Sequence, residues 1–379
     1  MPVNLVLEKT NQEEEKDKEK KNFIEKVNFL LIKLSGVPIK EKLFFVQHLG
    51  IMLRAGISLA ISLKTLSEQT ENKFFRLILV DVSKNVERGV SFTESLRPHR
   101  KVFGDLFISM VEAGEISGKL EEVLHQIFIQ LKKQHELISK VKGALTYPIV
   151  VVTAMGGIGI FMMIYVVPKI TDMLKSFNAE MPLATRILIA VSDALVQHGI
   201  LALVILIVVC AAIYKILHTY KGKFVFHSIL LKLPIFSDII KKINLAKFAR
   251  TISSLLKTDI AIIKSFQITA NVLGNLHYRK AMDEMAEKIK KGGQINEVIS
   301  AYPKLFPPTV RQMIAVGEQT GELDTILEEL ASFYEEEVDQ IMTNLPAIIE
   351  PVLILLLGCG IGGMAIAIIM PMYSLTSAV

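Results

Sequence analysis

Residues 111–120 read VEAGEISGKL and residues 315–323 read AVGEQTGEL, so the pattern Gly-Glu-x-(Ser/Thr)-Gly-x-Leu is written twice, 203 positions apart. The same offset aligns the sequence around both copies without a gap. The aligned pairs outside the pattern are Phe45 with Phe248, Leu53 with Leu256, Ile57 with Ile260, Gly89 with Gly292, Lys101 with Lys304, Phe103 with Phe306, Met110 with Met313 and Pro148 with Pro351. A long self-match at one fixed period indicates a duplicated structural unit. We therefore expect two homologous domains.

Each copy, about 39–142 and about 242–344, is predicted to be a helical bundle. Apolar residues recur at helical spacing in both copies, and no strand-like alternation persists. Gly56 and its counterpart Asp259 are expected at a turn, because both residue types tolerate backbone conformations that bulkier residues resist. We expect about six short helices in each copy.

The repeated pattern supplies candidate site residues. Ser117 and Thr320 are expected to cap the long last helix of each copy, because hydroxyl oxygens accept hydrogen bonds from the free amides of a helix start. Two interpretations remain open for Glu115 and Glu318: hydrogen bonding to free amides at a tight helix junction, or contact with a partner or an ion. The complete set is Gly114, Glu115, Ser117, Gly118, Leu120, Gly317, Glu318, Thr320, Gly321 and Leu323.

The composition favours a membrane protein. Hydrophobic residues make up 51% of the 379 residues, and the mean hydropathy is positive. Three long uncharged runs, 149–167, about 199–214 and 352–370, each approach the roughly 20 residues that a helix needs to cross about 30 Å of hydrocarbon. We therefore predict an all-α polytopic protein with three transmembrane helices.

The charges that flank these runs predict the orientation. Four lysines precede the first run and only two follow it closely, while a further basic group follows the second run. Cytoplasmic flanks carry an excess of Lys and Arg, so the N-terminus is expected in the cytoplasm. Two crossings separate the copies, and both would then face the cytoplasm.

The predicted organisation follows from the repeat and the apolar runs. Residues 1–38 are expected to form a charged tail and an amphipathic helix. This helix is expected to pack on its own bundle or on the membrane, and binding to a separate motor protein is the alternative. The remaining segments are a first cytoplasmic helical bundle (39–147), transmembrane helix 1 (148–168), an extracytoplasmic loop (169–196), transmembrane helix 2 (197–217), a second cytoplasmic helical bundle (218–348), transmembrane helix 3 (349–372) and an extracytoplasmic tail (373–379).

Further candidate residues lie where the bundles meet the membrane. Pro148 and Pro351 are predicted to mark the entry of each last helix into the bilayer, next to Tyr147 and Glu350, which occupy equivalent positions. For Glu350, interfacial solvation and a contact within an assembly both remain open. A GxxxG step and its extension in the third run predict close helix packing through Gly358, Gly362, Gly363 and Ala367.

The sequence offers no clustered catalytic, metal or nucleotide site. There is no GxxxxGK(S/T) phosphate-binding loop, and both cysteines, Cys210 and Cys359, fall inside apolar runs. We expect no enzyme activity, cofactor, metal or nucleic-acid binding. The alternatives are a membrane transporter or a membrane-bound enzyme, and substrate-dependent flux or turnover by the purified chain in liposomes would favour them.

The duplicated pattern, Tyr147-Pro148 before the first run and the stretch PLATR (182–186) before the second resemble the GspF/PilC family. These are inner-membrane platform proteins of type II secretion and type IV pilus machines, and the likeness covers about 37–373. It implies a non-enzymatic homo-oligomer of the cytoplasmic membrane that couples to a separate hexameric ATPase. It also implies contact with pilin or pseudopilin subunits and other inner-membrane assembly proteins. Asp259 and Glu350 depart from the family's glycine and tyrosine.

Overall fold

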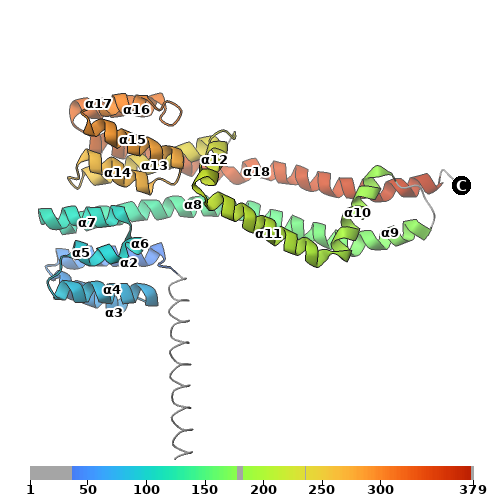
Figure 1. Cartoon of the computed structure of the whole chain (residues 1–379), viewed down its shortest axis with the longest axis horizontal. Helices are drawn as coiled ribbons and strands as arrows, with labels where there is room; N and C mark the ends of the chain where they lie inside the picture. The colour runs from blue at the N-terminus through green and yellow to red at the C-terminus, as the bar shows by residue number, and fades with distance from the viewer. Residues whose placement is uncertain (1–35, 177–181, 235, 377–379) are drawn as a thin grey trace, which may run out of the picture. The chain divides into compact units, whose positions relative to one another are not determined.

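The computed structural model describes residues 36–176, 182–234 and 236–376, and every regular element within these ranges is a helix (Figure 1). This confirms the all-α prediction. The predicted N-terminal amphipathic helix lies outside the described residues. Contacts divide the described chain into two units: unit 1 holds residues 36–135, 247–273 and 282–329, and unit 2 holds residues 136–176, 182–234, 236–246, 274–281 and 330–376.

The first copy of the repeat is built from short helices with polar caps. Asn72 starts one of them by accepting a hydrogen bond from the backbone N–H of Phe75 at 2.9 Å. The elements are α2 (Ile39–Arg54), α3 (Leu59–Gln69), α4 (Lys73–Glu87), α5 (Phe92–Leu96), the 3-10 turn η1 (Arg97–His99), α6 (Arg100–Phe103), α7 (Asp105–Ser117) and the long α8 (Leu120–Phe161).

The second copy repeats this order with turns in place of η1 and α6. Its elements are α13 (Phe236–Leu256), α14 (Ile262–Val272), α15 (Leu276–Lys290), α16 (Ile295–Ser300), α17 (Pro308–Thr320) and the long α18 (Leu323–Thr376). Gly56 and Asp259 occupy equivalent turns with φ of 79° and 58°. The sequence correctly predicts these left-handed positions, because glycine has no Cβ and aspartate is one of the few other residues that tolerate them.

Aromatic side chains form equivalent cores in the two copies. Phe45 and Phe103 are buried with ring centroids 6.1 Å apart, and their counterparts Phe248 and Phe306 lie 5.2 Å apart. Buried rings of this size contribute much of the apolar area that stabilises a small bundle. The repeat therefore encodes the same core twice.

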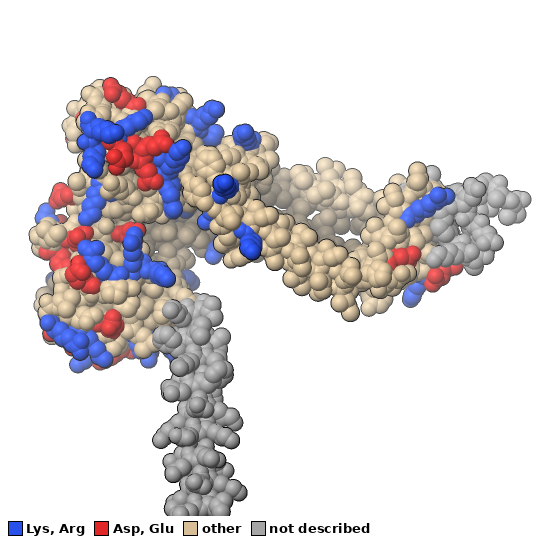
Figure 2. Space-filling model, in the orientation of Figure 1, with Lys and Arg blue, Asp and Glu red and all other residues tan. Residues whose placement is uncertain are grey.

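Three helices of the described chain are long and apolar enough to cross a membrane: Leu120–Met173, Gly199–His218 and Leu323–Ala367. Two of them, α8 and α18, begin in a repeat copy and continue without a break into the apolar segment, passing through Pro148 in α8. Figure 2 shows Lys, Arg, Asp and Glu gathered over the repeat helices, and a largely uncharged surface over α11 (Gly199–His218). This distribution fits an apolar solvent around α11.

Unit 2 joins its helices through a small core, an ion pair and a hydroxyl contact. Its remaining elements are the π-helical segment η2 (Met162–Val166), α9 (Val167–Ser176), α10 (Leu183–Gln197) and α12 (Tyr220–Leu230). The core contains Leu137 of α8 and Val338 of α18, and Lys140 pairs with Asp339 at 2.6 Å. The Ser192 hydroxyl of α10 donates to the carbonyl oxygen of Met163 at 2.6 Å, within the π-helical segment, where carbonyls leave the regular helix ladder.

Candidate functional site: the repeated helix junction

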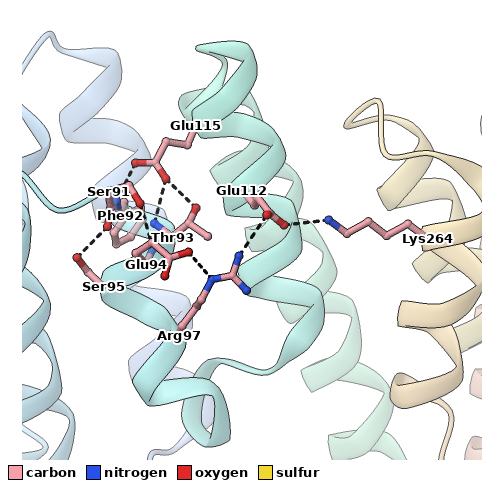
Figure 3. A network of polar contacts seen from close by, with 9 residues as sticks. All are labelled: Ser91, Phe92, Thr93, Glu94, Ser95, Arg97, Glu112, Glu115 and Lys264. Atoms are coloured by element: carbon pink, nitrogen blue, oxygen red, sulfur yellow. Dashed lines mark hydrogen bonds and ion pairs between the residues drawn. The ribbon is translucent and has the colours of Figure 1, made fainter.

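Glu115 joins the end of α7 to the start of α5 (Figure 3). Its Oε1 accepts a hydrogen bond from the Phe92 backbone N–H at 2.7 Å, and its Oε2 accepts from the Thr93 N–H at 3.0 Å and the Thr93 hydroxyl at 2.7 Å. Ser91 caps the same turn by accepting from the Glu94 N–H at 3.2 Å. The free amides of a helix start carry partial positive charge, so the carboxylate both satisfies them and interacts favourably with the helix dipole.

Glu318 makes the same junction in the second copy. Its carboxylate accepts from the Ile295 N–H at 2.7 Å and from the Asn296 N–H at 3.0 Å, and these residues are the exact counterparts of Phe92 and Thr93. The described contacts hold no counterpart of the hydroxyl bond, since asparagine replaces threonine. Each carboxylate is thus engaged by the amides of its own domain, while contact with an ion or a partner stays a prediction.

The first glycine of the pattern lets two helices approach closely. A Cβ added to Gly114 would lie 2.9 Å from the Cβ of Val123, and one added to Gly317 would lie 3.1 Å from the Cα of Leu323. Both distances are shorter than ordinary carbon contacts, so a side chain at either glycine would push α7 from α8, or α17 from α18. The pattern's leucine is the first residue of the long helix in each copy.

The second glycine reverses the chain between the two helices. Gly118 and Gly321 have φ of 70° and 77°, in the left-handed region that favours glycine. After Gly118, the Lys119 N–H donates to the Gly114 carbonyl at 2.9 Å, which closes the end of α7 in a Schellman arrangement. The sharp stop at glycine allows the long helix to begin two residues later.

The prediction that Ser117 caps the long helix is wrong. Ser117 is the last residue of α7, and its hydroxyl donates back to the Ala113 carbonyl at 2.8 Å. Thr320 likewise donates to the Val316 carbonyl at 2.9 Å and accepts from the Glu322 N–H only at 3.4 Å. Both residues precede the left-handed glycine, so they end the earlier helix and bond one turn back along it.

A chain of charged side chains extends from the junction to the second copy (Figure 3). Arg97 contacts Glu94 at 2.6 Å and Glu112 at 3.2 Å, and the other oxygen of Glu112 accepts from the Lys264 ammonium of α14 at 2.9 Å. The hydrogen bond from Lys264 lowers the pKa of the Glu112 carboxyl from its ordinary value. Sequence reasoning missed this contact because Glu112 aligns with Ala315 and Lys264 with Ile61, so the repeat does not mark it.

The residues predicted at the membrane entry lie on the two long helices. Tyr147 and Pro148 fall inside α8, and Glu350 and Pro351 fall inside α18, with the Tyr147 and Glu350 side chains exposed. The predicted packing glycines of α18 are Gly358, Gly362 and Gly363. A Cβ built on any of them has no described atom of another helix within 4 Å. Ala367 is buried, and its carbonyl accepts from the Thr185 hydroxyl of α10 at 2.6 Å. Packing of this glycine face on another helix stays a prediction.

The described residues hold no group of three or more His, Cys, Asp or Glu side chains arranged to bind a metal ion. The chemistry of the junction is therefore that of helix capping and ion pairing. The junction orders each bundle through these contacts, and among the described residues it holds no set of side chains that resembles a reaction centre.

Comparison with known proteins places the chain in a family. The sequence model described as "Type II secretion system (T2SS), protein F" matches residues 45–168 and again residues 248–371, at the same offset as the repeat. The chain is 37% identical over 341 residues to "Type IV pilus assembly protein PilC" of Thermus thermophilus, covering 90% of this chain and 84% of the relative. It is 32% identical over 344 residues to the PilC protein of Myxococcus xanthus, covering 91% and 82%. It is also 29% identical over 344 residues to "Type II secretion system protein F" of Aeromonas hydrophila, covering 91% and 88%. With its duplicated helical domain and three apolar helices, this chain belongs to the type II secretion system protein F family, which includes the PilC proteins.

Proposed function

We propose that this protein is a non-enzymatic platform of the cytoplasmic membrane that couples a separate cytoplasmic ATPase to the assembly of a type IV pilus or a type II secretion pseudopilus. Family membership supports the assembly role. The lysine-rich flanks support an orientation with the N-terminus and both bundles in the cytoplasm. In this orientation the bundles meet a hexameric ATPase, while the apolar helices meet pilin or pseudopilin subunits and other membrane assembly proteins.

One observation supports mechanical coupling between the bundles and the membrane. α8 and α18 are single helices that begin at the repeated junction and continue into the apolar segments. A helix transmits axial and rotational displacement with little loss, since its backbone hydrogen bonds hold each residue to the fourth one before it. Motion imposed on a bundle would therefore reach the bilayer along α8 and α18.

The test interrupts a long helix while leaving its bundle intact. Two glycines inserted after Lys142 in α8 weaken the helix between the bundle and the apolar segment, because glycine destabilises helix interiors. We expect the variant to reach the membrane and to co-purify with the ATPase, but to lose filament assembly or secretion while pilins accumulate in the membrane. The control carries the same insertion after Glu71, an exposed residue between α3 and α4, and should retain assembly.

Two results would contradict the proposal. Normal filaments with the interrupted α8 would show that this helix transmits nothing that assembly requires. Normal filaments and normal secretion in a strain that lacks the chain altogether would remove the platform role itself.

A further inference from the structure

The two copies of the repeat meet inside unit 1 through different faces. The first copy contributes α7 and α8, and the second contributes α13 and α14 (Figure 1). The contacts include the pair of Glu112 with Lys264 and the bonds of the Gln130 amide with Thr251 at 3.3 Å and Ser254 at 3.1 Å. When two homologous domains join through unlike faces, each domain has a second face that takes no part in the contact. This second face is equivalent to the one through which the other domain makes the contact. The repeat offset identifies both unused faces.

The first unused face lies on α2 and α3 of the first copy. Ser254 and Ile260 of the second copy are buried, 4% and 6% exposed, whereas their counterparts Ile51 and Ile57 are 53% and 36% exposed. Ile61, the counterpart of Lys264, is 60% exposed. We call the residues Ile51, Ile57, Ile61 and Glu68 the outer face. Exposed isoleucine side chains at positions whose counterparts in the second copy lie at the contact with the first, buried in the case of Ser254 and Ile260 and ion-paired in the case of Lys264, indicate an interaction surface rather than a solvated one.

The complementary positions lie on α17 and α18 of the second copy. Ala315 occupies the position of Glu112, and Phe333, which is exposed, occupies that of Gln130. Arg311 takes the place of the buried Ile108, and its Nε is buried without a hydrogen-bond partner among the described residues. A buried guanidinium nitrogen of this kind is costly unless another group reaches it.

The substitutions between the copies are matched in kind. The ion pair of Lys264 with Glu112 becomes an apolar pair, Ile61 with Ala315, and the polar pair of Ser254 with Gln130 becomes Ile51 with Phe333.

A third correspondence joins opposite charges. Asn271 and Ile108 line one pocket between the copies. At the repeat offset they become Glu68 and Arg311. Both partners change together at each of the three positions, which is the pattern expected of two surfaces that contact each other.

We propose that the outer face of one chain docks on the α17 and α18 helices of a second copy, so that subunits join head to tail through a repetition of their own internal interface. Such a heterologous contact builds a ring if its rotation closes and an open filament if it does not. The interface stands independently of any coupling to an ATPase, and failure of that proposed function would leave this one untouched.

The first test transplants the internal ion pair into the contact between chains. Ile61→Lys and Ala315→Glu each introduce a residue that the sibling copy already carries at the same position, so the fold accommodates both. Each single variant leaves one unpaired charge in the contact and should weaken subunit association by about tenfold or more, measured by light scattering of the detergent-solubilised full chain on dilution. The double variant should recover association to within about threefold of the natural chain. Leu77→Lys, at an exposed apolar position on α4, is the control and should change nothing.

The second test identifies the geometry of the contact. In a background with Cys210 and Cys359 replaced by alanine, chains that carry Ile61→Cys are mixed with differently tagged chains that carry Ala315→Cys, and a short bis-maleimide is added. A lysine and a glutamate reach across this distance, so the linker is preferred to a disulfide. We expect a product that carries both tags and none between two Ile61→Cys chains.

Four outcomes would each overturn the proposal. The natural chain is monomeric, the single variants associate normally, or the double variant associates no better than its weaker parent. The fourth is cross-linking only between like chains, which would indicate a two-fold contact instead.

Discussion

Replacing Glu318 by glutamine isolates what the motif carboxylate does for the junction. The side chain keeps its size and one acceptor oxygen, but an amide nitrogen now faces one of the two backbone N–H groups of Ile295 and Asn296. One charge-assisted hydrogen bond, worth about 1.5–3 kcal/mol, is lost, together with a helix-dipole contribution of about 0.3–1 kcal/mol. We expect the start of α16 to be destabilised by about 2–4 kcal/mol. For Glu115→Gln we expect a loss of the same size at the Phe92 N–H, because the remaining oxygen can take the place of Oε2 and keep both Thr93 bonds.

The assay follows the amides themselves. Hydrogen exchange of the full chain in detergent, read by mass spectrometry, should show protection of residues 295 and 296 falling by a factor of about 30 or more in Glu318→Gln, since 1.4 kcal/mol corresponds to tenfold. Protection at residues 92 and 93 should be unchanged in that variant and reduced in Glu115→Gln. The control is Glu287→Gln on the exposed side of α15, which should leave all four amides as they are.

Unchanged exchange at residues 295 and 296 in Glu318→Gln would refute the capping argument. The repeated glutamate would then serve a contact outside its own domain.

Three further predictions concern packing, charge and pH. Gly114→Ala should lower the melting temperature more than Gly317→Ala. The added Cβ would lie 2.9 Å from Val123 at the first position, but no closer than 3.1 Å to any neighbour at the second. Overpacking of this kind costs about 1–3 kcal/mol. Lys264→Met should cost only about 0.2–1 kcal/mol in urea unfolding, because the ion pair with Glu112 is partly exposed. Burial, together with the nearby Lys223 and His277, lowers the pKa of His227, whose neutral Nδ1 accepts from the Leu276 N–H at 3.1 Å. The unfolded chain protonates first as the pH falls through about 6.5, so this stabilisation is full above that pH and is lost below it. In His227→Gln, the free energy of unfolding measured against pH should lose the decrease that this histidine causes below about pH 6.5. A profile identical to that of the natural chain would contradict the prediction.

The amino-acid sequence by itself determined the duplicated helical domain, the three apolar helices and the glycine turns. These features are local or periodic. A hydrophobic run long enough to span a bilayer is visible along one dimension, and a left-handed turn at Gly56 or Asp259 depends on the residue that occupies it. The gapless offset of 203 positions, in turn, predicts that the second copy has the same fold as the first.

Only the tertiary structure decided which groups those repeated residues contact. The amides that Glu115 satisfies lie 22 and 23 residues earlier in the chain, and Lys264 lies 152 residues beyond Glu112. Ser117 shows the same limit at short range: its hydroxyl suits either helix end, and the left-handed Gly118 assigned it to α7. Contacts between distant segments leave no local periodicity in a single sequence, because they depend on how helices pack in space rather than on the spacing of residues along one helix.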